Sequence, residues 1–423
     1  MRTPPAPVAA AGTGQRARAW WRGPRGRLAA VWRVGVTAPV CVVALGLVLT
    51  AGIYYVRWGF GQDGIPPRIA FVDAGARFAP RIGLGAQVVA PQGYDGQFAY
   101  YLALHPELVA TCAYDHAHCP FDDPALRSER ILYPLAARLL ALGQPVAIPF
   151  ALFLIDFLAI LLTTGLVARL GLEAGASRWL GAAAGLFCGE ALALVRDLTD
   201  PFAVLWTVLA VWLLRRGRPL LGAAAVAAAL LTREQLALVL PLLALPLILQ
   251  RRWLPLAASA LIGLGPFVAW QVALHQIYGV WPLIHTARYA PTVPIPFLGL
   301  IFAGFWLKPP ALDVPLMVAF VAVPVALAFV IAVGSAVGAF RRAGPRAIAA
   351  NPVPLVVAAY AALVSITGLA SWVDLWAPAR LAAPALLLGL VVASDAPRPL
   401  RLTYVGLLAL SALAPLLMAV TRF

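Results

Sequence analysis

Long stretches without a charged side chain are the feature that most constrains this chain. Residues 34–56 are 23 consecutive uncharged, mostly apolar residues. At about 1.5 Å per residue, a helix of that length covers the roughly 30 Å hydrocarbon core of a bilayer. The chain of 423 residues is 62% hydrophobic and 12% charged, with a mean hydropathy of +0.87. This composition excludes an ordinary soluble domain and predicts an all-α, polytopic membrane protein.

Basic residues divide the apolar stretches and set their predicted orientation. The net charge is +15, but the arginines gather in short segments between apolar runs, such as 215–218, 251–252 and 341–346. Such clusters mark cytoplasmic loops, so the positive charge indicates topology and argues against nucleic acid as a partner. The pattern predicts about eleven spans, with the N-terminus inside and the C-terminus outside. The predicted spans are 34–56, 146–168, 178–195, 199–214, 219–232, 235–250, 253–275, 312–340, 353–372, 381–394 and 402–420.

The segments outside these spans complete the predicted organisation. Residues 1–33, rich in Pro, Ala, Gly and Arg, are expected to form a disordered basic arm in the cytoplasm. Residues 34–423 then form one membrane domain, in which 34–56 is retained as a signal-anchor. Its first outward loop is 57–130 and its second is the proline-rich segment 276–311. A single lysine beside many arginines is typical of a GC-rich bacterial source, so the predicted location is a bacterial plasma membrane.

Two predicted helix hairpins are too short to cross the membrane fully. The segment 219–250 has 32 residues and is interrupted by Arg233 and Glu234. Two crossings leave about 15 residues each, or ~22 Å of helix, so this turn is expected to lie below the outer surface. The same reasoning applies to Asp197 and Asp200 at the tip of the preceding hairpin. Charges at that depth are costly and often mark a substrate path, so all four residues are candidates for substrate binding.

An acid on the first outward loop is the candidate catalytic group. Asp95 lies in the segment 93–98, Gly-Tyr-Asp-Gly-Gln-Phe, at the start of a predicted amphipathic helix. A carboxylate near the outer membrane surface suits glycosyl transfer from a lipid-phosphate sugar, with the acid as general base for the acceptor hydroxyl. Its neighbours Tyr94, Gln97 and Tyr100 are candidates for sugar binding. The plain alternative is that Asp95 only caps the helix, and the two roles are compatible.

Three outward arginines near the ends of spans suit the phosphate of a lipid donor: Arg130, Arg233 and Arg380. A guanidinium group binds phosphate through paired hydrogen bonds. The alternative for each is an arginine that merely reaches the lipid headgroups, although the predicted burial of Arg233 argues against it there. With a sugar and a phosphate between them, Asp95 is expected roughly 6–12 Å from a guanidinium in the recess that is predicted to hold Arg130 or Arg233.

Two cysteines on the first outward loop have two interpretations. Cys112 and Cys119 enclose His116 and His118, and the four side chains together are zinc-type ligands. Adjacent residues at positions 118 and 119 make tetrahedral closure awkward, however. Because an outward loop is oxidising, a disulfide between Cys112 and Cys119 is the favoured prediction, with no metal site.

Several of these segments together resemble a known group of membrane proteins. The segment 94–98 followed by 130–134 resembles a family of bacterial polytopic proteins with "YDGQF" and "RILYP" motifs. The segments 197–201 and 231–234 add to the resemblance. The arrangement is similar to the GT-C superfamily of integral membrane glycosyltransferases, including GPI-anchor mannosyltransferases with a Trp-Asp-Gly motif in the first loop. The resemblance covers roughly residues 70–250.

This resemblance implies a GT-C fold with Asp95 as the catalytic acid and a periplasmic active face. The implied donor is a polyprenyl-phosphate sugar, and the implied acceptor is a lipid, glycan or protein in contact with membrane lipids. Many GT-C enzymes carry paired acids in the first loop, whereas Asp95 is flanked by Tyr and Gly. This departure favours a mechanism without a cofactor, although a divalent Mg or Mn ion stays open. Asp73 can supply a second carboxylate if the loop folds back.

Two other classes of function remain as alternatives. A lipid or glycan transporter, or flippase, is compatible with the predicted spans, but the sequence has no evident inverted repeat. A non-catalytic membrane component of surface-glycan assembly would share the same sidedness. The predicted role of Asp95 separates these classes, because only the enzyme needs that carboxylate for chemistry.

Overall fold

The computed structural model describes residues 36–59, 70–83, 93–289, 292–307 and 312–421. Helices make up 78% of the structure, which confirms the predicted all-α class. An isolated β-bridge pairs Thr292 with Thr367. The predicted arm 1–33 and parts of both predicted outward loops lie outside the described residues.

Six helical segments of the described chain are long and apolar enough to span a membrane. They are Thr37–Val56, Pro145–Glu173, Trp253–Tyr278, Asp313–Ala343, Trp376–Asp395 and Arg398–Met418. The main helices within them are α3 (Thr37–Gly59), α8 (Ile148–Glu173), α14 (Trp253–Tyr278), α18 (Val323–Ala343), α21 (Trp376–Val392) and α22 (Arg398–Leu410). The protein is therefore a helical membrane protein, and the count of about eleven spans stays a prediction.

Shorter helices pack among these six. They are α9 (Leu180–Gly185), α10 (Cys188–Leu194), α11 (Asp200–Arg215), α12 (Pro219–Thr232), the 3-10 helix η5 (Glu234–Val239), α13 (Leu240–Leu249), α20 (Val353–Ser365) and α23 (Leu413–Thr421). The predicted span 178–195 is broken, because α9 ends at Gly185 and α10 starts at Cys188. The residues from Trp179 to Gly189 are uncharged, so hydropathy gave no sign of the break between them.

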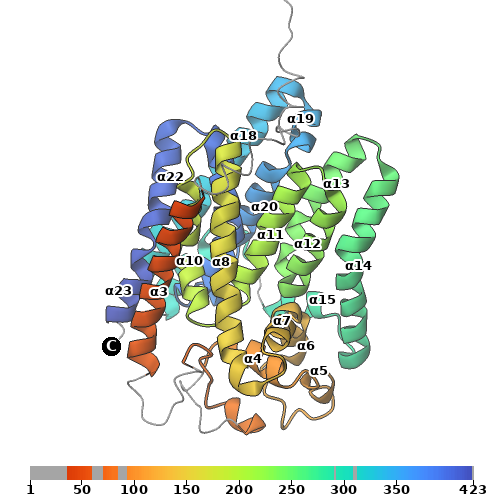
Figure 1. The fold of residues 1–423 in the computed structure, drawn as a ribbon, viewed down its shortest axis with the longest axis vertical. Helices are drawn as coiled ribbons and strands as arrows, with labels where there is room; N and C mark the ends of the chain where they lie inside the picture. The colour runs from red at the N-terminus through yellow and green to blue at the C-terminus, as the bar shows by residue number, and fades with distance from the viewer. Residues whose placement is uncertain (1–35, 60–69, 84–92, 290–291, 308–311, 422–423) are drawn as a thin grey trace, which may run out of the picture.

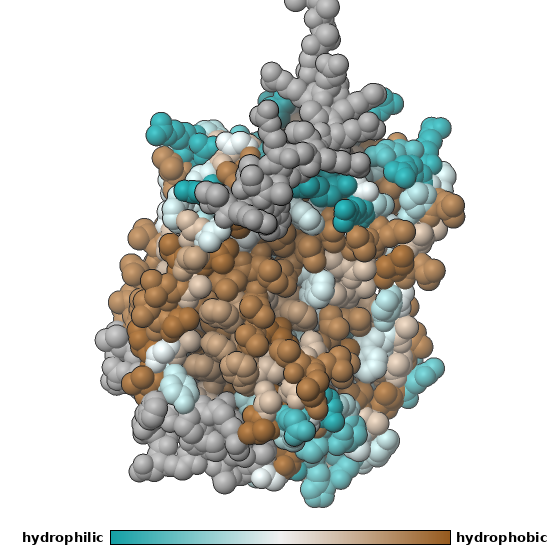
Figure 2. Space-filling model, in the orientation of Figure 1, coloured by the Kyte–Doolittle hydropathy of each residue, from teal (hydrophilic) through white to brown (hydrophobic). Residues whose placement is uncertain are grey.

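The two ends of the bundle differ in what they carry. One end holds the short helices α4 (Gly96–Leu104), α5 (Leu108–Thr111), α6 (Pro124–Glu129) and α7 (Leu132–Leu140). The opposite end holds helix α19 (Pro345–Ala350) and the turn between α13 and α14 (Figure 1). A hydrophobic belt lies between hydrophilic ends, as expected for a chain embedded in a bilayer (Figure 2). We call the first the site end and the second, which carries Arg251 and Arg252, the basic end.

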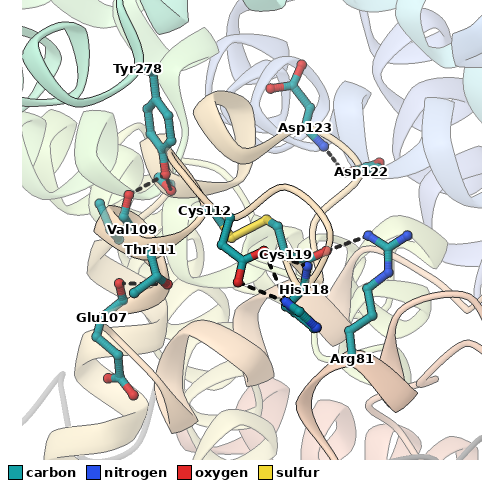
Figure 3. The surroundings of a disulfide bond; sticks show 12 residues. Arg81, Glu107, Val109, Thr111, Cys112, His118, Cys119, Asp122, Asp123 and Tyr278 are labelled. Atoms are coloured by element: carbon teal, nitrogen blue, oxygen red, sulfur yellow. Dashed lines mark hydrogen bonds and ion pairs between the residues drawn. A yellow bond between two sulfur atoms is a disulfide. The ribbon is translucent and has the colours of Figure 1, made fainter.

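A disulfide fastens the polypeptide at the site end. Cys112 and Cys119 are bonded, with their Cα atoms 5.0 Å apart. The carbonyl oxygen of Cys119 accepts a hydrogen bond from Nη1 of Arg81 at 2.6 Å, which ties this loop to the segment 79–82 (Figure 3). His118 lies beside Asp115, with Nδ1 2.9 Å from a carboxylate oxygen, and so does not share a site with the cysteines. Both cysteines are buried in the same apolar cluster as Phe98 and Ala99 of α4, the helix that follows Asp95.

Candidate functional site

The two glycines that flank Tyr94 and Asp95 lie where the backbone packs closely against other segments. The start of α4 presses against the connection between α10 and α11, and a Cβ atom on Gly96 would overlap the backbone carbonyl of Arg196. Gly93 has φ +69°, and a Cβ there would lie 2.7 Å from the carbonyl oxygen of Asp73. Both positions therefore require glycine, because a side chain has no space at either. This close approach brings Asp95 to the ends of α10 and α11.

Gln97 serves the fold of the segment. Its side-chain oxygen accepts hydrogen bonds from the backbone N–H of Gly75 at 3.0 Å and from the hydroxyl of Tyr101 at 3.2 Å. Gln97 and Tyr100 are both buried, and Tyr100 belongs to the apolar cluster at the site end. Neither belongs to the wall of the pocket beside Asp95 among the described residues. Their predicted contact with a sugar therefore has no support in this arrangement.

Asp95 is held between two arginines. Its Oδ2 lies 2.5 Å from Nη2 of Arg380, and its Oδ1 lies 3.0 Å from Nη1 of Arg127. The carboxylate makes no capping hydrogen bond to α4, so the helix-cap alternative is wrong. Arg380 and Arg127 thus contact Asp95 directly. The expected spacing of roughly 6–12 Å to Arg130 or Arg233 stays a prediction. These carboxylate oxygens occupy positions on Arg380 and Arg127 that a phosphate could take.

Further ion pairs continue from this centre. Arg130 binds Glu234 through two hydrogen bonds of 3.0 and 2.9 Å. Arg233 lies 2.8 Å from Asp200, which is also 3.8 Å from Arg380. The turn that carries Arg233 and Glu234 is buried, with exposed fractions of 7% and 2%, as the short hairpin predicted. The sequence-predicted charges thus converge at one place, with each guanidinium beside a carboxylate.

A small, closed pocket lies beside Asp95. Its wall combines two acids and three arginines with a few apolar side chains: Asp95, Asp197, Arg127, Arg130, Arg380, Phe98, Ala99, Leu102, Leu198 and Thr199. Its volume of about 20 Å³ is enough for roughly one water molecule. The site is therefore closed in this structure, and a sugar phosphate can enter only if these ion pairs separate.

The pKa values of the two acids of the pocket, Asp95 and Asp197, are shifted in opposite directions. Burial raises the pKa of Asp95, but the charges of Arg127, Arg380 and Arg130 outweigh it and hold that pKa well below its usual range. Asp197 is only 1% exposed, and its Oδ1 has no hydrogen-bond partner. Burial raises the pKa of Asp197 well above its usual range. One carboxyl group is thus kept ionised, while the other readily holds a proton.

A second pocket lies on the other side of Arg380. Its wall is mostly apolar but includes three charged groups and a tyrosine: Asp200, Ala203, Val204, Arg233, Gln235, Leu236, Tyr360, Arg380, Leu381 and Pro384. Arg233 belongs to this inner pocket, and Arg130 belongs to the pocket beside Asp95. Arg380 lines both. The three predicted phosphate-binding arginines are therefore divided between two small spaces.

Asp73 forms an ion pair with Arg196, which is not one of the arginines that contact Asp95. Its carboxylate pairs with Arg196, and it is only 2% exposed. The guanidinium of Arg196 also lies 4.6 Å from the ring centre of Trp376 and 5.5 Å from that of Tyr94. Asp73 does not line the pocket beside Asp95 among the described residues, so its role as a second carboxylate stays a prediction. Tyr94 supports this neighbouring cation through its ring face.

Sequence reasoning missed Arg127. Helix α6 starts at a capping residue, Asp123, whose carboxylate accepts a hydrogen bond from the N–H of Leu126. Arg127 follows one turn later, lies 4.1 Å from the ring centre of Phe98 and reaches Asp95. Little in the sequence pointed to Arg127, because α6 ends at Glu129 and Arg130 lies beyond the helix, so the two arginines do not share a helix face.

The described acids are not arranged around a common metal centre. No group of three or more His, Cys, Asp or Glu side chains in the described chain could hold a metal ion. The carboxylates of the site contact guanidinium groups instead. Comparison of the chain with protein-family models, curated proteins and solved structures gave no match.

Proposed function

We propose that this protein is a GT-C-type glycosyltransferase of a bacterial plasma membrane, with its active site at the periplasmic face. The donor is a polyprenyl-phosphate sugar, and the acceptor is a hydroxyl group of a lipid, glycan or protein. One observation carries the proposal: the ionised Asp95 shares a pocket with Arg127, Arg130 and Arg380 at the site end of a membrane bundle. This arrangement suits glycosyl transfer, because the acid can act as general base and the arginines can stabilise an anionic leaving group.

The donor phosphate binds by replacing Asp95 on its arginines. Arg380 and Arg127 each hold one oxygen of the Asp95 carboxylate. A phosphate offers the same kind of acceptor with more negative charge, so it competes for the same guanidinium groups. Separation of these ion pairs also opens the closed pocket. Donor binding and pocket opening are therefore one event.

The same exchange prepares Asp95 for catalysis. While paired with two arginines, its pKa is too low for an effective base. Once the phosphate holds the arginines, the pKa of Asp95 rises towards its ordinary value. The acceptor oxygen then bonds to the anomeric carbon of the sugar, the bond from that carbon to the phosphate oxygen breaks, and Asp95 takes the hydroxyl proton. Polyprenyl phosphate leaves with its negative charge stabilised by the arginines.

A binding experiment tests the first step. Purified protein is titrated with undecaprenyl phosphate, and binding is followed by tryptophan fluorescence. Arg380→Gln should weaken binding roughly tenfold to hundredfold, the range for a charged hydrogen bond. Arg398→Gln is the matched control, since Arg398 is exposed at the start of α22, beyond the end of α21 that lies opposite Arg380. Asp95→Asn should bind undecaprenyl phosphate more tightly than wild type, because it frees the competing arginines.

A second experiment tests the chemistry. Envelope lipids and glycans are compared by mass spectrometry between a strain lacking the gene and strains carrying wild type or Asp95→Asn. The proposal expects the glycan product to be lost in Asp95→Asn, although that variant still binds undecaprenyl phosphate. An unchanged glycan profile in Asp95→Asn would overturn the enzyme proposal and favour the flippase or scaffold.

A further inference from the structure

A larger cavity lies at the basic end, away from the site. It has a volume of about 540 Å³ and is formed where α12 and α14 begin. Arg218 and Arg252, the residues immediately before these two helices, both belong to its wall. The rest of its wall is apolar and includes Leu220, Leu221 and Leu254. The cavity thus has cationic groups at the helix starts and an apolar surface directly beyond them.

The two arginines are not neutralised by the protein. Both residues are exposed, and neither forms an ion pair with a carboxylate in the described part of the chain. The nearby Arg216, by contrast, is paired with Glu173 at 2.5 Å. The backbone N–H groups at the starts of α12 and α14 add partial positive charge at the same level. An anionic group is the ligand that this part of the cavity favours.

The apolar wall indicates what must be attached to that anion. Leu221 and Leu254 are 52% and 82% exposed, and Trp253 beside them is 61% exposed. Leu221 is three residues after Arg218, which places it about 4.5 Å further along the helix. A free phosphate ion leaves such a wall uncovered. A molecule with an anionic head and hydrocarbon chains covers both parts at once.

We propose that this cavity binds an anionic diacyl phospholipid from the leaflet at the basic end. Its phosphate contacts Arg218 and Arg252, and its acyl chains lie over Leu220, Leu221 and Leu254. Positive residues between membrane helices bind acidic lipids in this way, and the charge pattern assigns this end to the cytoplasm, where such lipids are abundant. The proposal is independent of the chemistry at the site end.

Native mass spectrometry tests this assignment. The full-length protein is equilibrated with equal amounts of phosphatidylglycerol and phosphatidylcholine in mixed micelles, and the retained lipids are counted. A preference of about fivefold for each arginine gives roughly 25-fold for phosphatidylglycerol. Arg218→Gln with Arg252→Gln should remove that preference. The matched control is Arg341→Gln with Arg342→Gln, which removes equal charge from the last turn of α18 at the same end.

Two further outcomes would overturn the proposal. Equal loss of preference in the control would mean that overall surface charge, rather than this cavity, selects the lipid. Competition by free glycerol 3-phosphate as effective as that by phosphatidylglycerol would mean that the apolar wall does not contribute. Leu254→Ser provides a third check: it keeps both arginines and should weaken phosphatidylglycerol retention several-fold, whereas unchanged retention would contradict the predicted acyl contact.

Discussion

Nη2 of Arg380 lies 2.5 Å from Oδ2 of Asp95, although 285 positions separate the two residues in the chain. The contact joins the start of α4 to α21, a helix whose side chains are mostly buried. Each group neutralises the other where neither is fully hydrated, so loss of one leaves a charge without compensation. The position of Asp95 therefore depends on a helix close to the far end of the sequence.

Loss of one partner from the Arg130–Glu234 pair should destabilise the protein strongly. Arg130→Ala leaves Glu234, only 2% exposed, without its two hydrogen bonds. We expect the free energy of unfolding in mixed micelles to fall by about 3–5 kcal/mol. The double variant Arg130→Met with Glu234→Leu should recover much of this loss, because it removes both charges. A double variant as unstable as Arg130→Ala would show that the pair stabilises by more than mutual neutralisation.

Gly96→Ala should disrupt the site, whereas a glycine elsewhere should tolerate the same change. A methyl group at Gly96 overlaps the backbone carbonyl of Arg196, so α4 must move, at a cost of about 1–3 kcal/mol or more. Gly52 in α3 has no atom within 4 Å of the added Cβ. Gly52→Ala should be neutral or stabilise by about 0.5–1 kcal/mol. Thermal unfolding of both variants measures the difference, and equal melting temperatures would contradict the close packing.

Asp197→Asn should stabilise the protein more as the pH rises. Because burial raises the pKa of Asp197 in the folded state, the folded form binds more protons than the unfolded form above about pH 3.9. This residue therefore reduces stability progressively with increasing pH, by at most about 1.4 kcal/mol per pH unit, up to its raised pKa. The melting-temperature difference between Asp197→Asn and wild type should grow from pH 4.5 to 7.5.

The stability of Asp95→Asn should depend on pH differently from that of Asp197→Asn. The folded-state pKa of Asp95 is lowered, so its stabilising contribution is fully present above about pH 3.9 and is lost only at lower pH. Asp95→Asn should therefore reduce the melting temperature by a similar amount across pH 4.5–7.5. If the melting-temperature differences of Asp95→Asn and Asp197→Asn from wild type changed with pH in the same way, the opposite pKa shifts of the two acids would be contradicted.

Thiol labelling should find two of the four cysteines. In denatured, unreduced protein, a maleimide should label Cys41 and Cys188, which are free, and label all four cysteines after reduction. Cys112→Ser with Cys119→Ser should lower stability by about 2–3 kcal/mol, the range for closing a loop of this size. Labelling of all four before reduction would show that the disulfide does not form.

The sequence predicted the parts of the site but not their contacts. Arg233 and Glu234 could be assigned to a buried turn because helix length alone limits how far a short hairpin extends. The partner of Asp95 could not be assigned this way, because Arg127 and Arg380 reach it from segments far apart in the chain. An arginine side chain is long, so sequence position does not show which of several carboxylates it contacts.

The helix count shows a different limit. Hydropathy identified apolar stretches correctly, and the long helices α3, α8 and α14 start within a few residues of the predicted spans 34–56, 146–168 and 253–275. It did not show that the stretch 178–195 breaks after Gly185, because the residues immediately around the break are apolar. Just after the break, α10 packs closely on α21: a Cβ on Gly189 would lie 2.6 Å from the carbonyl oxygen of Ala379. Such contacts between distant helices carry no local signal.

Arg380 belongs to the wall of both small pockets, and this has a thermodynamic consequence. A group bound beside Asp95 draws Arg380 towards it and away from Asp200, which alters the inner pocket. A group bound in the inner pocket acts on the pocket beside Asp95 through the same side chain. Thermodynamic linkage requires the two effects on affinity to be equal. Arg380 therefore couples the occupancy of the two pockets. Whether binding in one pocket strengthens or weakens binding in the other depends on whether Arg380 moves away from Asp95 or from Asp200.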